Sequence, residues 1–204
     1  MRIIALLLSL MLAHVCFAGE DTNVVAMSGW SKAVGTYHGQ RLRARLILAQ
    51  EHSPAHAGSS PETQLYVELQ NVTRYAGAPL QIYFDPKRGL HCDLFDSSGT
   101  LQPAEFDLGG MGPSPAWISL PYDSTIRLRA SMFGYGAQKG DGFDLDLPGN
   151  CQRWRFGPGD TNAYFLSGRF AATPPTNFVA KDFEAERAIW SGNLEIPKMQ
   201  ISVK

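Results

Sequence analysis

Alternation of apolar and polar residues constrains this chain more than any other feature of its sequence. Every second residue across 65–70 is Leu or Val, which is the period of a strand with one buried face. A second apolar register runs through 80–84, and a third run follows at 90–96. Turn formers at 71–79 and 85–89 separate the three runs. The pattern predicts three consecutive strands joined by two turns.

Similar patterns cover most of the remaining chain and predict further strands. Their expected positions are 42–48, 117–121, 125–130, 143–147, 151–156, 163–172 and 194–203. Gly168 is the expected site of a bulge, and one short helix is expected at 181–189 with Asp182 as its N-cap. Many short strands punctuated by Gly and Pro predict an all-β fold, an antiparallel two-sheet sandwich with one short helix near the C-terminus.

The first 18 residues have the layout of a secretory signal peptide. Arg2 precedes an apolar run over 3–13, and small residues lie near Ala18. This run is too short to cross the core of a bilayer, which needs about 20 residues. We therefore expect removal of residues 1–18 and a single exported domain at 19–204, periplasmic or extracellular, soluble and without a membrane span.

Cysteine usage predicts one disulfide. If Cys16 leaves with the signal peptide, Cys92 and Cys151 form an even pair in an oxidising compartment. In the chain-entropy model, closing this loop stabilises the fold by about 4 kcal/mol. A reactive thiol or a metal pair is the alternative, but no Cys-x-x-Cys and no nearby His pair accompanies them. Lipoprotein processing at Cys16 is disfavoured because His14 and Val15 are poor substitutes for the small residues that it requires.

Motifs that carry chemistry are sparse, and we expect no catalytic residue, no metal and no cofactor. His52 and His56 lie four apart, but Pro54 between them excludes the helix that would align both on a metal ion. The acidic residues at 141–146 lack the Glu that closes a calcium loop, and no Gly-x-Ser-x-Gly elbow is present. The balance of 18 basic and 19 acidic side chains gives no reason to expect nucleic acid as a partner.

Arginines recur at every second position in three of the predicted strands. Each set would stand on one face of its strand, suited to carboxylate, sulfate or phosphate groups. The alternative is cross-strand pairing with Glu68, Asp144 and Asp146, which the near-neutral charge favours. The candidate binding surface consists of Arg41, Arg43, Arg45, Arg127, Arg129, Arg153 and Arg155, with Trp117, Tyr135 and Trp154. Long loops at 97–116 and 134–142 are further candidates.

Three short motifs occur in the order in which one family of domains arranges them. They are Leu65-x-Val67-x-Leu69-x-Asn71-x-Thr73 running on to Ala78-Pro79, Trp117-Ile118-Ser119-Leu120, and Trp190-Ser191-Gly192-Asn193-Leu194-Glu195-Ile196-Pro197. Together they resemble the immunoglobulin-like β-sandwich domains of uncharacterised exported bacterial proteins. The resemblance covers most of the chain after the signal peptide. It implies a fold, and it implies no activity and no functional residue.

These features predict a non-catalytic exported protein that binds another envelope or secreted protein. One alternative is a carbohydrate- or polyanion-binding module, in which Trp117, Trp154 or Tyr135 would be exposed on one surface. Another is a hydrolase with a cleft under the 97–116 loop that holds two carboxylates or a His–carboxylate pair. Asn71-Val72-Thr73 fits the glycosylation acceptor pattern, which matters only in a eukaryotic secretory pathway.

Overall fold

The computed structural model describes residues 23–36, 38–51, 62–74, 79–106, 114–130, 143–147, 151–157 and 159–202. These residues form mainly strands, with one short helix among them. The predicted signal peptide at 1–18, the loop at 134–142 with Tyr135, and the pair His52 and His56 lie outside the described residues. No helix within the described ranges is long and apolar enough to cross a membrane.

The first main sheet contains the longest alternating run of the sequence. Its strands are β1 (Asn23–Met27), β2 (Val34–Gly35), β3 (Arg41–Glu51), β4 (Glu62–Asn71) and β10 (Thr125–Arg129). The strand order is β1-β3-β4-β10, and β2 also pairs with β3. Every pairing in this sheet is antiparallel.

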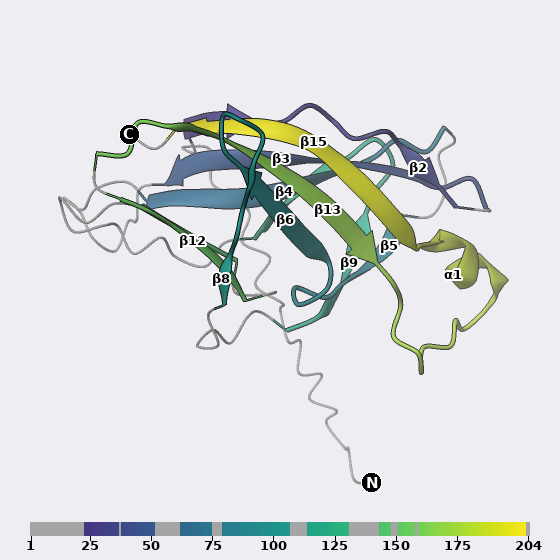
Figure 1. Ribbon diagram of the computed structural model, residues 1–204. Helices are drawn as coiled ribbons and strands as arrows, with labels where there is room; N and C mark the ends of the chain where they lie inside the picture. The colour runs from purple at the N-terminus through teal and green to yellow at the C-terminus, as the bar shows by residue number, and fades with distance from the viewer. Residues whose placement is uncertain are drawn as a thin grey trace, which may run out of the picture.

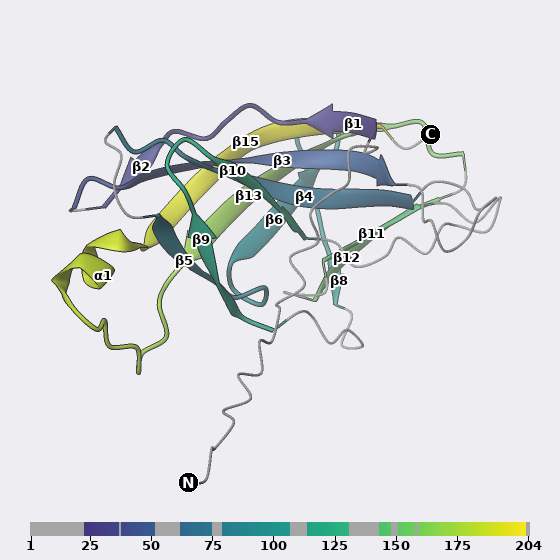
Figure 2. The same ribbon diagram turned by 180° about the vertical axis from the view of Figure 1, so that it is seen from behind.

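The second main sheet lies face to face with the first. Its strands are β6 (Leu90–Phe95), β7 (Leu101–Gln102), β13 (Ala163–Ala172) and β15 (Gly192–Ser202), in the antiparallel order β15-β13-β6-β7. In Figure 1, β15, β13 and β6 cross in front of β3 and β4. Figure 2 shows the opposite side, with β3, β4 and β10 toward the viewer.

Two smaller sheets complete the described fold. One contains β8 (Glu105–Phe106), β11 (Phe143–Leu147) and β12 (Gln152–Phe156), in the order β11-β12-β8; the other contains β5 (Leu80–Phe84), β9 (Ala116–Leu120) and β14 (Ile189–Trp190), in the order β14-β5-β9. The β14–β5 pair is parallel. The described strands thus form four sheets with one parallel pair, where alternation predicted two antiparallel sheets. The difference arises because the alternation of apolar residues shows which face of a strand is buried, but it does not show which other strand pairs with it.

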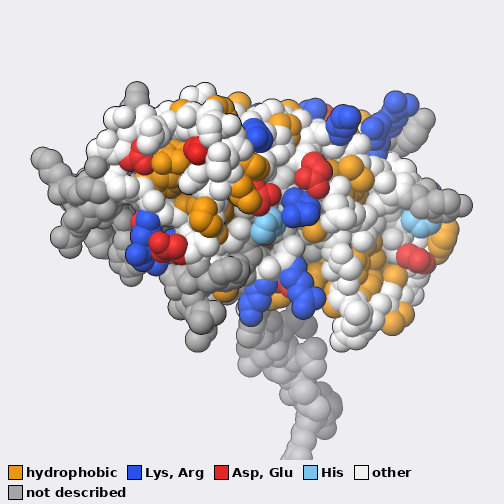
Figure 3. Space-filling model, in the orientation of Figure 1, with side chains coloured by type: hydrophobic (Ala, Val, Ile, Leu, Met, Phe, Trp, Pro, Cys, Tyr) orange, Lys and Arg blue, Asp and Glu red, His pale blue; other side chains and the backbone are white. Residues whose placement is uncertain are grey.

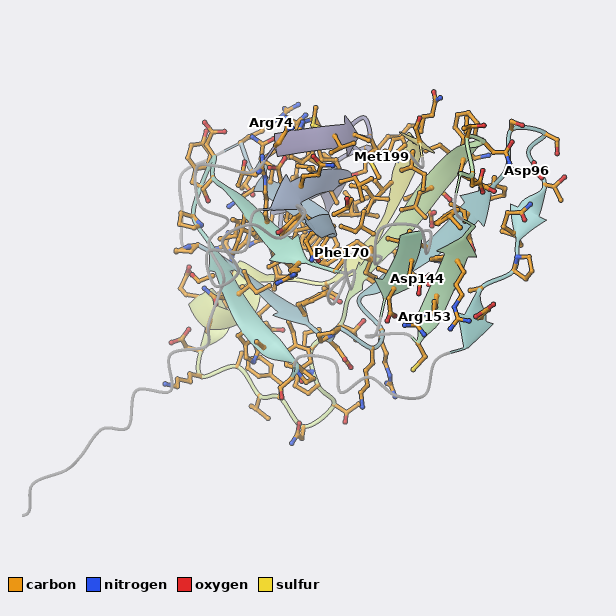
Figure 4. The ribbon with its side chains drawn as sticks, turned by 90° about the vertical axis from the view of Figure 1, so that its left-hand side faces the viewer. Arg74, Asp96, Asp144, Arg153, Phe170 and Met199 are labelled. Atoms are coloured by element: carbon orange, nitrogen blue, oxygen red, sulfur yellow. The ribbon has the colours of Figure 1, made fainter. Side chains whose placement is uncertain are left out.

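Apolar residues from all four sheets form one core. Leu46 of β3 meets Gly168 of β13, where an added Cβ would lie 3.2 Å from the Leu46 Cδ1 atom. Phe170 is fully buried and stacks on Phe84 with ring centroids 5.8 Å apart. Figure 4 shows Phe170 and Met199 among the packed side chains of the interior. Since each large apolar side chain contributes about 1.5–3 kcal/mol when buried, this core holds the facing sheets together.

Of two local predictions, the capped helix is confirmed and the position of the bulge is wrong. The helix α1 (Phe183–Ala188) begins after Asp182, whose side chain accepts a hydrogen bond from the Ala185 backbone N–H at 2.8 Å. This is the N-cap interaction expected of an aspartate at that position. The bulge expected at Gly168 is not on β13, which pairs with β6 through Gly168 without a register shift. The extra residue lies on β15, where Pro197 and Lys198 together oppose Ser167, and Pro197 has no backbone N–H to give to the pairing.

Candidate functional site

Five of the seven predicted surface arginines lie on the outer side of the first main sheet. We call them the arginine face: Arg41, Arg43 and Arg45 of β3, with Arg127 and Arg129 of β10. The strand β4 lies between β3 and β10, and its Glu68 is the register partner of both Arg45 and Arg127. Since alternate residues of a strand point to the same side, these side chains lie opposite the core-facing leucines. Strand adjacency, which the sequence left open, is what brings the two arginine sets together.

Cross-strand pairs restrain most of the arginine face. The Glu68 carboxylate, only 5% exposed, accepts hydrogen bonds from the Nε atoms of Arg45 and Arg127, the second at 2.8 Å. Neutral glutamines make similar pairs: Arg43 Nε donates to Gln70 Oε1 at 2.7 Å, and Arg129 Nε donates to Gln64 Oε1 at 3.1 Å. The pairing that the sequence offered as the alternative to ligand binding is therefore present. The buried Glu68 carboxylate pairs with the guanidinium groups of both Arg45 and Arg127.

Two serines that follow β1 fasten the chain to β3. Ser28 Oγ accepts from the Leu46 backbone N–H at 2.9 Å, and Ser31 Oγ accepts from that of Ala44 at 3.0 Å. The backbone N–H groups of both serines donate in return to the carbonyls of Leu46 and Ala44. Each serine therefore makes two hydrogen bonds to one residue of β3, one through its backbone N–H and one through its side-chain oxygen. They hold the intervening Trp30 beside the outer face of β3.

Trp30 lies against two members of the arginine face. The guanidinium carbon of Arg43 is 4.6 Å from the Trp30 ring centroid, and that of Arg45 is 4.3 Å from it. Both distances are within the range of a cation–π interaction, which contributes about 0.5–1 kcal/mol at an exposed site. The ring therefore restrains two guanidinium groups at once. Nothing in the local sequence around Trp30 indicated this contact, which depends on the pairing of β1 with β3.

The remaining two arginines lie on a different sheet. Arg153 Nε is 3.7 Å from an Asp144 oxygen, an Arg153 Nη is 3.6 Å from Asp146, and Arg155 Nε is 3.6 Å from Glu105. Figure 4 shows Asp144 and Arg153 side by side on neighbouring strands. Asp144 and Asp146, considered above as calcium ligands, thus contact arginines. Only the Arg155–Glu105 pair is well exposed on both sides, and such a pair contributes at most about 1 kcal/mol.

The tryptophans predicted to share a surface lie in different environments. Trp154 is 4% exposed and its Nε1–H donates to the Gln102 carbonyl at 3.2 Å. It occupies an inward-facing position of β12, so it belongs to the core and not to a binding surface. Trp117 is 38% exposed on β9, and Tyr135 lies outside the described residues. The described residues therefore do not bring Trp117 and Trp154 together.

A different group of aromatic side chains meets at the surface, and we call it the aromatic cluster: Tyr83, Trp117 and Phe178. Tyr83 and Trp117 are register partners on β5 and β9, with ring centroids 5.3 Å apart and ring planes at 60°. Phe178, from the connection between β13 and α1, contacts Trp117 at 4.8 Å with ring planes at 47°. The next residue, Val179, is 84% exposed. In Figure 3, hydrophobic side chains are visible at the lower right of the molecule, the part in which Figure 1 draws the connection between β13 and α1.

Sequence reasoning identified only Trp117 of the aromatic cluster. The outward position of Tyr83 follows from the alternation in β5, where Leu80, Ile82 and Phe84 are buried. That signal was available, but it does not show which strand lies beside β5. The position of Phe178 has no local signal, because its segment reaches β9 only through the tertiary fold.

The described residues do not assemble the carboxylate cleft that a hydrolase would need. Glu105 and Asp144 both approach Arg155, at 3.6 and 3.9 Å from its Nε, but all three side chains are well exposed. The His91–Asp93 pair, 3.4 Å apart, is also exposed, on the outer side of β6. No group of three His, Cys, Asp or Glu side chains in the described ranges is placed to hold a metal ion. Residues 107–113 of the predicted cover loop lie outside the described ranges.

The two cysteines are free thiols in the structure. Cys92 is fully buried, and burial raises the pKa of its thiol far above the usual value. The Gln152 side chain accepts from the Cys92 backbone N–H at 3.2 Å and donates to the Cys92 carbonyl at 2.9 Å. Cys151 therefore precedes a residue that is fastened to Cys92, and it has φ of 60°, which is left-handed backbone. The disulfide is not formed in the structure and stays a prediction.

Asn71, the first residue of the glycosylation motif, has a structural role. Its side chain is buried, and its Nδ2 donates to the carbonyls of Leu120 and Pro121, both at 3.1 Å. Its Oδ1 accepts from the Thr73 backbone N–H at 3.1 Å. The amide nitrogen to which a glycan would be attached is therefore used within the fold. This arrangement joins the end of β4 to the turn between β9 and β10.

Comparison of the chain with protein-family models, curated proteins and solved structures found no match in any of the three. The described residues offer two candidate functional surfaces. One is apolar and aromatic, on the β5–β9 sheet. The other is cationic, on the β3–β4–β10 face.

Proposed function

We propose that this chain is a non-catalytic exported protein that binds another envelope or secreted protein, built on an immunoglobulin-like β-sandwich. The observation that carries the proposal is the aromatic cluster. Trp117 and Phe178 are 38% and 37% exposed, although large aromatic side chains contribute most when buried. Exposed Trp and Tyr side chains that gather at one place are typical of the centre of protein interfaces.

The tilt of the rings favours a protein partner over a glycan. A flat sugar face contacts an aromatic ring best when the ring face is open, and several sugars require several rings in one plane. Here the Tyr83 and Trp117 rings meet edge-on at 60°, and the Phe178 ring is tilted by 47° from that of Trp117, so the three rings do not share a plane. Such a surface is uneven, and uneven apolar surfaces are matched by the side chains of a protein partner. The aromatic cluster therefore supports a glycan ligand less strongly than a protein partner.

The sheet beneath the cluster gives it a preformed shape. Ile82 and Ile118, register partners on β5 and β9, are buried in the core below it. Beside the rings, Gln81 Nε2 donates to Ser119 Oγ at 3.0 Å, which ties the same two strands. A surface that is ordered before binding loses less conformational entropy in the complex. The cluster can therefore contribute most of its contact energy to affinity.

Export is supported by the sequence alone, through the predicted signal peptide at 1–18. The proposal expects a mature chain that begins at Gly19 when the full precursor is expressed in a bacterium with a secretion system. N-terminal sequencing of the periplasmic or secreted product tests it. A product that retains Met1, or that stays in the cytoplasm, would contradict export while leaving the aromatic cluster unaffected.

Binding is tested with the mature protein and an envelope extract. A photo-crosslinking amino acid at position 119 should capture one protein partner, and the same probe at position 193, on the exposed side of β15, serves as the control. The affinity of the captured partner is then measured for the wild type, Trp117→Ala and Tyr122→Ala. Loss of a central Trp costs about 2 kcal/mol or more, so Trp117→Ala should weaken binding at least about 30-fold.

Tyr122 provides the matched control because it is 45% exposed in the turn after β9, outside the cluster. Tyr122→Ala should leave the affinity unchanged. Equal capture from positions 119 and 193, or an unchanged affinity in Trp117→Ala, would reject the cluster as the binding surface. A partner that is recovered as a glycan would favour the alternative reading.

A further inference from the structure

The side chains of Arg43 and Arg45 lie on the outer side of β3, where both are partly exposed. Each uses its Nε for a cross-strand hydrogen bond, to Gln70 and Glu68 respectively. No acceptor among the described residues pairs with their terminal Nη atoms. A guanidinium whose Nε is occupied still presents two N–H groups from its Nη edge, which match two oxygens of an anion. The two guanidinium groups come from residues that are two apart on β3, so they lie on the same side of the strand.

Trp30 makes this pair of edges more ordered than exposed arginines usually are. It lies within 4.6 Å of both guanidinium carbons, and the serine contacts at Ser28 and Ser31 hold its backbone against β3. A free arginine side chain loses up to about 2 kcal/mol of rotamer entropy when a ligand orders it. Here much of that ordering is already present in the unliganded protein, so an anion would bind with a smaller entropic penalty.

The local charge also favours an anion. Arg41 precedes the pair on the same side of β3, and the described carboxylate on this face, Glu68, is shared between Arg45 and Arg127. Arg43 has only a neutral partner. The cationic charge of Arg41 and Arg43 is therefore not matched by a carboxylate of the described part of this face. A doubly charged sulfate or phosphate group balances two guanidinium groups better than a singly charged carboxylate does.

We propose that Arg43 and Arg45, held against Trp30, form a binding site for a sulfate or phosphate group. The site lies on a different sheet from the aromatic cluster, so it is independent of the proposed protein contact. The group could be a free anion or a substituent of a glycan, since both present the same oxygens. The chemistry of recognition is the same in each case, and the experiment separates the two sources.

The test uses NMR on the 15N-labelled mature protein. Inorganic sulfate and phosphate are titrated at constant ionic strength, with acetate as a singly charged comparison and chloride as the salt control. The indole N–H of Trp30 and the Nε–H signals of Arg43 and Arg45 should shift saturably with sulfate or phosphate. Acetate should bind at least about tenfold more weakly. A heparin-derived hexasaccharide then tests whether a glycan-borne sulfate binds more tightly than the free ion.

Variants are chosen to keep the fold. Arg43→Gln removes a charge that is hydrogen-bonded to neutral Gln70 and lies over the Trp30 ring, so no carboxylate loses its partner. Arg45→Lys keeps a cation for Glu68 while removing the planar fork. Each should weaken sulfate binding about tenfold or more, and the amide spectrum should remain dispersed. Arg169→Gln, at an exposed arginine of β13, is the control and should leave affinity unchanged.

Three results would overturn the proposal. They are an absence of saturable shifts at Trp30, equal affinity for acetate and sulfate, or undiminished binding in folded Arg43→Gln protein. Saturation by sulfate with no gain from the hexasaccharide supports the site and identifies a free anion as its ligand. A gain of tenfold or more with the hexasaccharide supports the site and identifies a glycan. Neither outcome bears on the Trp117 experiment, so the two surfaces can fail separately.

Discussion

Removal of the Glu68 carboxylate tests whether the arginine face is built as described. Glu68 accepts charge-assisted hydrogen bonds from both Arg45 and Arg127 and is almost completely buried. Glu68→Ala deletes both bonds and leaves two guanidinium groups without their anion. Glu68→Gln keeps the shape and one acceptor oxygen, but it removes the charge. The two variants therefore separate the effect of charge from the effect of volume.

The expected loss follows from the exposure of the partners. A hydrogen bond to a charged group contributes about 1.5–3 kcal/mol, so two such bonds set an upper limit of about 6 kcal/mol. Arg45 and Arg127 are 21% and 31% exposed, and water can solvate them in part once the carboxylate is gone. That solvation, and the desolvation that Glu68 no longer suffers, reduce the net loss to about 2–3 kcal/mol for Glu68→Ala. Glu68→Gln should lose about half of that.

Urea denaturation followed by circular dichroism measures the free energy of unfolding, with an unchanged m-value as the sign of an intact fold. For a chain of this size, the loss in Glu68→Ala corresponds to a fall of roughly 5–10 °C in Tm. Glu195→Ala, an exposed acid on β15, is the control and should change stability by less than about 0.5 kcal/mol. A loss in Glu68→Ala no larger than in this control would refute the buried triad.

Three further outcomes test other parts of the structure. Gly89→Ala should lose about 1–3 kcal/mol because its Cβ would lie 2.7 Å from a backbone oxygen, whereas Gly157→Ala, with open space around it, should be tolerated in the same urea assay. If Cys92 and Cys151 join on export, the denatured protein should show no free thiol, and reduction should lower stability by up to about 4 kcal/mol; two titratable thiols would contradict the bond. The Ser98 hydroxyl and nearby backbone N–H groups lower the pKa of the Asp96 carboxyl, so NMR should place its midpoint below that of a free aspartate. Its stabilisation is then present above the unfolded pKa and lost as pH falls through the folded pKa; a midpoint at or above the usual value would contradict these contacts.

Features that depend on neighbouring residues could be predicted from the sequence. The period of two in 65–70 and 163–172 predicted β4 and β13, because a strand with one dry face must alternate. Asp182 predicted the start of α1, because a capping carboxylate contacts a backbone N–H three residues ahead. Gly168 marks a place where another side chain comes close, the Leu46 side chain of β3, but the bulge expected there lies on the partner strand β15.

Features that depend on which strands lie side by side could not be predicted from the sequence. The sequence placed Trp154 and Trp117 in similar short strands, yet one is buried beneath its sheet and the other is exposed. It identified the arginines of β3 and β10 but not that only β4 lies between them. The strands β7 and β8 fall in a stretch that has too few residues per strand to show a period.

The sequence by itself determined that this chain is a β protein with leucines on the inner side of β3 and arginines on its outer side. Alternation decides that much, because each strand has only two sides and one must be dry. Only the tertiary structure decided that Trp30 lies against Arg43 and Arg45, and that Phe178 contacts Trp117. These contacts join segments whose approach depends on the order of strands in the sheets, and strand order is set by the packing of the whole core.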